Sequence, residues 1–271
     1  TPMTGVLGMA DLLAAEDLTA VQRQYVETIR GSGSHLLSII NDILDFSRIE
    51  AGRLDLERLD FAPAMLVEQV RSLLASQATE RGLELRLADV PAADLVVQGD
   101  PTRVRQVLVN LVGNALKFTA RGEVVLTLSV RATPGPGVTM RFAVRDTGIG
   151  IPEEKQAHVF EAFAQEDGSI SRRFGGTGLG LSISRQLVTL MGGRMWLESA
   201  TGNGSTFHFT VDLAIAAPQT APSPPAAPAP VTAAVTGNAD ILLVEDNRVN
   251  QKVAIALLER RGFRVTVAEN G

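Results

Sequence analysis

Three residues spaced along one predicted helix could bind a magnesium nucleotide. Asn110, Asn114 and Lys117 stand four and three residues apart, so they share one side of a helix. Amide oxygens can ligate a hard cation such as Mg²⁺, and an ammonium group can meet phosphate oxygens. A helix with only a structural role would spread polar residues over its solvent face. The alignment therefore favours a site for Mg²⁺ and a triphosphate.

A buried carboxylate is predicted at the end of a strand. Apolar residues alternate from Val138 to Val144, and Asp146 is in phase with them just before Gly148 and Gly150. A lone buried Asp is costly, and the exocyclic amine of adenine is a suitable partner. Guanine presents a carbonyl there, so this carboxylate could select ATP over GTP. An ordinary Asp-Gly turn explains the same residues equally well.

A glycine cluster opens a later predicted helix. The cluster spans 176–180, and the helix spans Leu181 to Met191. Free backbone amides and the positive end of the helix dipole would lie where phosphates could bind. The polar stretch before it, 165–174, contains Arg172 and Arg173, and its composition suits a lid that closes over a ligand. A Gly-x-Gly-x pattern alone is weak evidence.

A helical hairpin should precede these elements. Helical periodicity runs from about residue 3 to 15, and Thr19 with Gln22 forms a capping box that opens a second helix reaching about Ala51. Its apolar residues, which continue to Phe46 and Ile49, are too many for a two-helix hairpin to bury. We therefore expect a homodimer with a four-helix bundle.

Helices and strands mix in the central part of the chain. The predicted helices are Pro63–Arg81, one following Asp100-Pro101, and Glu153–His158. The predicted strands are Leu83–Leu87, Leu95–Gln98, Gly122–Val130, Val138–Asp146, Arg194–Glu198 and Ser205–Leu213, with the third and fourth antiparallel.

An Ala-, Pro- and Thr-rich linker follows, from about Ala217 to Asp240. After it we expect a fully buried strand, Ile241–Val244, then the acidic pair Glu245 and Asp246, a helix over Val249–Arg260 and a short strand. So short a segment cannot bury an adequate core, and we expect it to be poorly packed.

Composition narrows the possible functions. The 271 residues are 45% hydrophobic and 20% charged, which allows a sizeable core, and the net charge of −5 argues against nucleic-acid binding. The absence of cysteine excludes disulfides and thiolate metal sites. There is no apolar run long enough for a membrane helix and no signal peptide, so we expect a cytoplasmic location, with any anchor or sensor outside this sequence. The three histidines, His35, His158 and His208, are interpreted as structural.

Five segments, in order, resemble the ATP-binding boxes of the sensor histidine kinases. Asn110–Thr119 resembles the asparagine box, and the glycine and phenylalanine boxes are matched by Asp146–Gly150, Phe160–Phe163, Gly176–Gly180 and Gly202–Thr206. The resemblance implies that Asn114 ligates Mg²⁺ with help from Asn110, that Asp146 reads adenine, and that Lys117 and Arg172 or Arg173 hold phosphates. The other implied ATP contacts are Gly148, Gly150, Phe160, Gly176, Thr177, Gly178, Leu179, Gly180 and Thr206.

Both ends of the chain extend this resemblance. Thr1–Gly8 is similar to the sequence that follows the phospho-acceptor in the motif His-Glu-x-x-Thr-Pro, so the acceptor should stand just before Thr1. Thr1 then matches the position that helps to orient water for phosphatase action, and Ile39–Gly52 resembles the second helix of the same domain. The last segment is similar to the start of a response-regulator receiver, in which Glu245 and Asp246 bind Mg²⁺ beside a phospho-accepting Asp beyond Gly271.

The resemblance implies an α+β multidomain chain that belongs to a hybrid sensor kinase. Its predicted domains are a dimerisation and phosphotransfer domain (1–57), an α/β-sandwich ATP-binding domain shared with gyrase-type ATPases (58–216), the linker (217–239) and a flavodoxin-like receiver start (240–271). The implied enzyme is a protein-histidine kinase that uses ATP and Mg²⁺, with its own or a separate receiver as partner. Lacking the acceptor, this stretch should not phosphorylate itself.

One residue separates kinase from hydrolase chemistry. Gyrase-like relatives carry a glutamate one helical turn before the magnesium asparagine, where it activates water. Here that residue is Asn110, which cannot act as a base near neutral pH. We therefore favour the kinase over two alternatives, a gyrase-like ATPase and a dimeric scaffold that only binds nucleotide.

Overall fold

The computed structural model describes residues 2–91, 95–133, 137–163, 178–216 and 239–268. These residues fall into two compact units. One comprises Thr1–Asn41 with Thr220–Gly271, and the other comprises Asp42–Gln219. The predicted domain boundaries at residues 57, 216 and 239 stay predictions.

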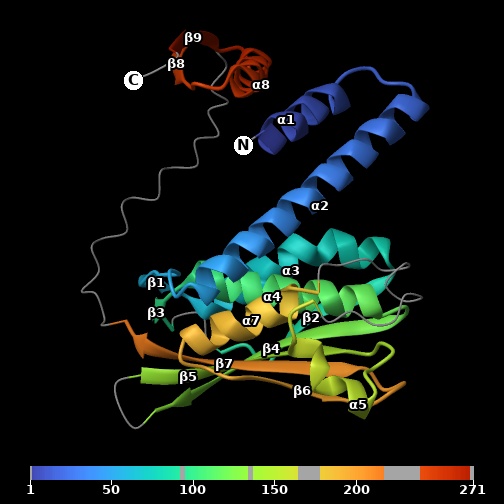
Figure 1. Cartoon of the computed structure of the whole chain (residues 1–271), viewed down its shortest axis with the longest axis vertical. Coiled ribbons are helices and arrows are strands. Elements are labelled where there is room, and N and C mark those ends of the chain that lie inside the picture. The colour runs from blue at the N-terminus through green and yellow to red at the C-terminus, as the bar shows by residue number, and fades with distance from the viewer. Residues whose placement is uncertain (1, 92–94, 134–136, 164–177, 217–238, 269–271) are drawn as a thin grey trace. The chain divides into compact units, whose positions relative to one another are not determined.

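The first unit contains most of a helical hairpin. Helix α1 spans Pro2–Ala14, and α2 is one continuous helix from Ala20 to Glu50 whose last turns belong to the other unit (Figure 1). The predicted capping box at its start is confirmed. The Thr19 hydroxyl accepts from the Gln22 backbone N–H at 3.3 Å, and the Gln22 side chain accepts from the Thr19 N–H at 3.0 Å.

The hairpin leaves large apolar side chains exposed on a single chain. Seven of them lie between residues 6 and 40: Val6, Leu13, Val21, Tyr25, Ile29, Leu36 and Ile40. Large apolar side chains that are exposed in such number along one hairpin are typical of a protein–protein interface.

The end of the chain forms a small parallel β-α-β segment: β8 (Asp240–Val244), α8 (Arg248–Glu259) and β9 (Arg264–Ala268). The prediction that its first strand is fully buried is wrong, because Leu242 and Val244 are 65% and 53% exposed. Among the described residues this sheet has two strands, and Leu242 and Val244 alternate with partly buried residues along β8, so they share its exposed face.

The second unit is a seven-stranded sheet with helices against one face (Figure 1). The strand order is β1-β3-β7-β5-β4-β2, and β6 pairs with β7. In chain order the elements are β1 (Leu59–Phe61), α3 (Pro63–Glu80), β2 (Leu83–Ala88), β3 (Val97–Gly99), α4 (Pro101–Phe118), β4 (Gly122–Ala132), β5 (Gly137–Asp146), α5 (Glu153–Gln156), η1 (His158–Phe160), α7 (Gly180–Leu190), β6 (Met195–Ser199) and β7 (Ser205–Ile215).

Most predicted elements of this unit are present with ends shifted by one or two residues, and β4 and β5 are antiparallel as expected. Strand β1 was missed, since three residues are too few to show a period. The predicted helix Glu153–His158 is instead a short α-helix followed by a 3₁₀ turn.

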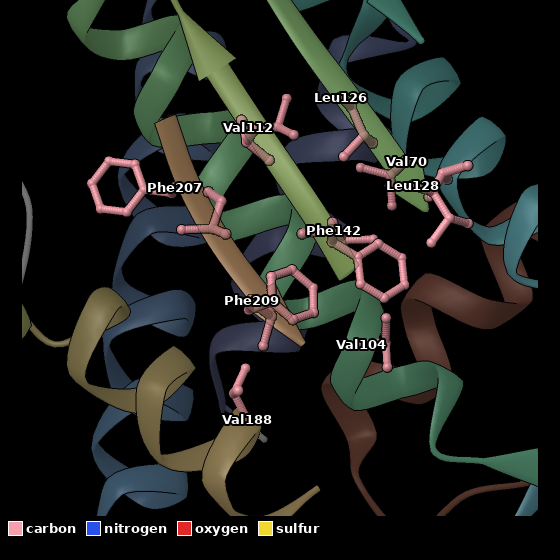
Figure 2. Close-up of a cluster of buried hydrophobic side chains, with 14 of the residues drawn as sticks. Val70, Val104, Val112, Leu126, Leu128, Phe142, Val188, Phe207 and Phe209 are labelled. Atoms are coloured by element: carbon pink, nitrogen blue, oxygen red, sulfur yellow. The ribbon is translucent and has the colours of Figure 1, made fainter. Parts of the chain in front are cut away.

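The core lies between the sheet and the helices. Phe142 on β5 faces Phe209 on β7, and their rings stack at 4.7 Å between centroids (Figure 2). Val104 and Val112 of α4 and Val188 of α7 meet the same cluster from the helix layer. Each fully buried side chain of this size contributes about 1.5–3 kcal/mol, so this layer holds the strand ends and helix faces in place.

Candidate functional site

Helix α4 carries the polar stripe predicted from the sequence. Its start is capped as expected, because the Asp100 carboxylate accepts from the Arg103 backbone N–H at 3.0 Å and Pro101 occupies the first turn. Further along, Asn114 Nδ2 donates to Asn110 Oδ1 at 3.3 Å. Asn110 and Asn114 are therefore in contact, and the oxygen of Asn114 is the polar atom suited to a cation.

Helix α7 begins directly against this stripe. Asn110 Nδ2 donates to the Ser184 hydroxyl at 2.9 Å. A Cβ at Gly180 would lie 2.4 Å from Asn110 Oδ1, so a larger residue here would displace the Asn110 side chain. Gly178 and Leu179 precede the helix, and Leu179 is 1% exposed. The amino-terminal end of α7, where the helix dipole is positive, thus lies beside the amides of α4.

Lys117 lies in the last turn of α4. Burial lowers the pKa of its ammonium group, and the nearby Arg81 guanidinium lowers it further. Its Nζ lies 4.9 Å from the centre of the Phe118 ring. A partly desolvated cation attracts an anion more strongly than an exposed one does, which suits a phosphate contact.

Asp146 ends β5 as a buried carboxylate, as the alternation predicts, and is 6% exposed. Its Oδ1 accepts from the Gly148 backbone N–H at 2.8 Å, and the Ser205 backbone N–H also donates to the carboxylate. Burial raises the pKa of Asp146 and outweighs these two hydrogen bonds, which act in the opposite direction. Gly150 follows in the same turn with a φ of +67°.

The residue of β7 that contacts the Asp146 carboxylate is Ser205, and not the predicted Thr206. Thr206 lies opposite Arg145 and Glu198 in the register of β7, on the outer face of the sheet. Ser205 is buried, in phase with Phe207 and Phe209. That period-two alternation was visible in the sequence and could have selected Ser205. Ser184, by contrast, showed no signal of its own.

Phe160 has a packing role in this structure. It is 8% exposed, meets the Phe207 ring edge-on at 6.2 Å, and lies beneath the Arg185 guanidinium at 5.6 Å. A nucleotide contact by Phe160 stays a prediction.

Five predicted site residues, and the predicted lid, lie outside the described residues. They are Thr1, Arg172, Arg173, Gly176 and Thr177.

The acidic pair after β8 is held locally. Glu245 Oε1 accepts from the Asn247 N–H at 3.1 Å and from Asn250 Nδ2 at 3.2 Å, whereas Asp246 is exposed. Within the described ranges no group of three or more His, Asp or Glu side chains is arranged to hold a metal ion. A Mg²⁺ site at Glu245 and Asp246 stays a prediction.

The three histidines differ in their surroundings. His35 is exposed, and His158 is exposed and 3.0 Å from Glu161. His208 is buried in the outer layer of the sheet, stacked on Trp196 at 5.0 Å.

Comparison with known proteins places this arrangement in a family. Residues 1–52 match the His Kinase A (phospho-acceptor) domain, and residues 99–215 match the histidine kinase-, DNA gyrase B- and HSP90-like ATPase family. The chain belongs to the histidine kinases. Residues 1–52 include the helical hairpin, and residues 99–215 include all the described nucleotide residues.

Relatives of this histidine kinase are longer proteins. The chain is 47% identical over 216 residues to the signal transduction histidine-protein kinase BarA of Escherichia coli K12, covering 79% of this chain and 23% of BarA. It is 42% identical over 270 residues to the sensor histidine kinase AruS of Pseudomonas aeruginosa, covering 100% of this chain and 26% of AruS. The chain therefore spans about a quarter of each relative.

Solved structures of histidine kinases are also similar to this chain. A crystal structure of full-length ShkA in complex with AMPPNP matches with a TM-score of 0.65 and 37% identity, covering 98% of this chain and 52% of that chain. The Acinetobacter baumannii histidine kinase AdeS, at 21% identity and a TM-score of 0.54, shares the fold. No described helix of this histidine kinase is long and apolar enough to span a bilayer.

Proposed function

We propose that the chain is the core of a hybrid sensor histidine kinase. It would transfer the γ-phosphoryl group of ATP to a histidine and then to a receiver aspartate. The observation that carries this proposal is Asn110, which occupies the position where a hydrolase needs a general base and which donates to Ser184 instead. A carboxamide cannot take a proton from water near neutral pH, so ATP would be held for another nucleophile.

The residues present fit Mg²⁺ and ATP. Mg²⁺ prefers oxygen ligands and is usually bound through one or two protein groups together with substrate phosphates. Asn114 Oδ1, with Asn110 beside it, supplies that kind of ligand, and the ion would neutralise charge on the phosphates. ShkA, the 37% identical neighbour, was solved with AMPPNP, which supports an ATP-type ligand.

Asp146 would identify the base. Its carboxylate accepts hydrogen bonds, so it pairs with the exocyclic amine of adenine and repels the carbonyl of guanine. Its raised pKa reflects burial without a full counter-charge, which a donor from the ligand would relieve.

Catalysis would rest on position and charge. Lys117 and the amino-terminal end of α7 lie where they can hold phosphates, and Arg172 or Arg173 would add further positive charge. Holding the γ-phosphoryl group in line with an imidazole nitrogen lowers the entropic part of the barrier. The remaining implied contacts, Gly148, Gly150, Gly176, Thr177, Gly178, Leu179, Gly180 and Thr206, belong to this proposal.

The proposed assembly is a homodimer through the helical hairpin, whose exposed apolar residues a second copy would cover. The proposed acceptor histidine stands upstream of Thr1. Residues 240–271 would begin a receiver domain, in which Glu245 and Asp246 bind Mg²⁺.

The test is incubation with γ-labelled ATP. The 271-residue chain should bind Mg-ATP without labelling itself, whereas a chain extended upstream through the acceptor should gain an acid-labile, base-stable label. Label on His35, His158 or His208 would show that the acceptor is misplaced. ATP hydrolysis without an acceptor would favour a gyrase-like ATPase, and binding without any transfer would favour the scaffold.

A further inference from the structure

The last turns of α2 contact the nucleotide helix through one carboxylate. Asp45 Oδ2 accepts from Arg103 Nη1 at 3.2 Å and from Gln106 Nε2 at 2.8 Å. The same Arg103 nitrogen donates to Gln106 Oε1 at 2.8 Å, which closes a three-residue network. The side chains of Asp45 and Arg103 are only 15% and 20% exposed. A pair this sheltered is screened less than a surface ion pair, and losing one partner costs more.

Arg103 and Gln106 continue the nucleotide stripe of α4. Positions 103, 106, 110, 114 and 117 follow one another at three- and four-residue steps, so all five side chains lie on one side of the helix. The carboxyl-terminal part of this stripe forms the nucleotide site. Its amino-terminal part binds Asp45. A rotation of α4 would therefore move both sites together.

A second point of contact lies at Phe46. The helical period predicts that Phe46 and Ile49 belong to the apolar face of the hairpin, but in the structure both pack against the core of the Asp42–Gln219 unit. The Phe46 ring meets the Phe163 ring at 6.3 Å and 67°. The Phe163 N–H donates to Gly178 O at 3.1 Å, so this contact adjoins the residues that open α7.

The chain turns sharply just after these contacts. Helix α2 ends in a Schellman motif, in which the Arg53 N–H donates to Arg48 O at 2.8 Å and Gly52 takes a φ of +62°. Leu54 and Leu56 then pack against the core. Two separate contacts, Asp45 with α4 and Phe46 with Phe163, restrict rotation between the end of α2 and α4 more than a single contact would.

The geometry points to Asp45 as a positioning residue for phosphoryl transfer. It touches neither nucleotide nor acceptor; its role is to hold α4, and with it the γ-phosphoryl group, at one angle to the helix that leads into the dimerisation hairpin. This inference rests on the proposed kinase function. Transfer is sensitive to placement, and a misplacement of about 1 Å can cost about 100-fold in rate. Nucleotide affinity depends on Asn114, Lys117 and Asp146, and these lie beyond the network.

The experiment compares Asp45→Asn with the unchanged sequence in the chain extended upstream through the proposed acceptor. We expect the rate of labelling at saturating ATP to fall by about 10- to 100-fold, with nucleotide affinity, measured by calorimetry, changed by less than about twofold. Exchange of the pair, Asp45→Arg with Arg103→Asp, should restore much of the rate, because Gln106 can donate to or accept from either side chain.

Two control variants test whether a loss of rate in Asp45→Asn comes from the contact with α4 and not from a general loss of charge or of folding. Glu50→Gln removes an exposed carboxylate from the same helix, and Arg105→Gln removes a neighbouring arginine that bonds Gln69 on α3 instead. Both should keep the full rate. An unchanged or faster rate in Asp45→Asn would overturn the inference, as would affinity falling in parallel with rate. Absence of label in the unchanged extended chain would overturn the kinase proposal and this inference with it.

Discussion

Asp146 and Glu245 each follow an apolar strand, and their surroundings show how the two compact units of this kinase differ. Asp146 ends β5 in the middle of a seven-stranded sheet, is 6% exposed, and accepts from amides that belong to two different segments. Glu245 follows β8 in a two-stranded sheet, and its carboxylate accepts from Asn247 and Asn250, both within five residues of it. Both are acidic residues after an apolar strand, but the carboxylate of Asp146 accepts from the distant Ser205, whereas these two donors to the Glu245 carboxylate are near it in sequence. The carboxylate at a strand end is held more completely when a neighbouring strand of the sheet also donates to it.

The largest effect should come from the core beneath these strands. Phe209→Ala removes a ring stacked on Phe142, so the free energy of unfolding of the Asp42–Gln219 unit should fall by about 3–5 kcal/mol. Leu242→Ala in β8 removes a side chain that is 65% exposed, and should cost under about 0.5 kcal/mol. Urea denaturation followed by circular dichroism measures both. Equal losses would mean that the two sheets are equally well packed.

Asp146→Ala should abolish measurable ATP binding while the protein stays folded. Losing a charged hydrogen bond in a buried pocket should weaken binding by about 100-fold or more. Because burial raises the pKa of Asp146, its ionised form opposes folding at neutral pH, and the thermal midpoint should hold or rise. Glu245→Ala is the control and should leave ATP affinity unchanged. Near-normal affinity in a folded Asp146→Ala protein, measured by calorimetry, would disprove the adenine assignment.

A smaller effect is expected for the metal. Asn114→Ala should leave magnesium-free nucleotide binding intact and remove most of the gain in affinity that Mg²⁺ gives, about 10-fold. Calorimetric titrations with and without Mg²⁺ would measure that difference. Retention of the full magnesium dependence would mean that another group ligates the ion.

The smallest expected effect is a pH dependence of the stability that comes from His208 and not from His158. Burial lowers the pKa of His208 below its ordinary value of 6.5, and Arg141 adds to this while Glu198 opposes it. The unfolded chain therefore takes up this proton at a higher pH than the folded one, and stability should fall as the pH drops below 6.5. Urea midpoints at pH 7.5 and 5.5 should differ less in His208→Gln than in the unchanged protein. The exposed His158 serves as control, and an equal change in His158→Gln would contradict this assignment.

Local patterns predicted a large part of the fold. The caps at Thr19 and Asp100, the polar spacing on α4 and the alternation that buries Asp146 each depend on residues within a few positions of one another. The three-residue strand β1 is too short to show a period, so no local pattern predicts it. The apolar run of β8 predicts a buried strand, but such a run does not reveal which of its faces will be covered.

The sequence by itself determined the helix caps and the apolar periods, since backbone geometry sets these over one or two turns or strands. Tertiary structure decided which distant groups complete them. Ser184 is 74 residues from the Asn110 amide that donates to it, and Arg103 is 58 residues from Asp45. The raised pKa of Asp146 and the packing of Phe46 against the core, where the sequence predicts the hairpin face, also result from burial by distant residues. Burial and long-range pairing depend on how the sheet and helices close together, and no local pattern records that closure.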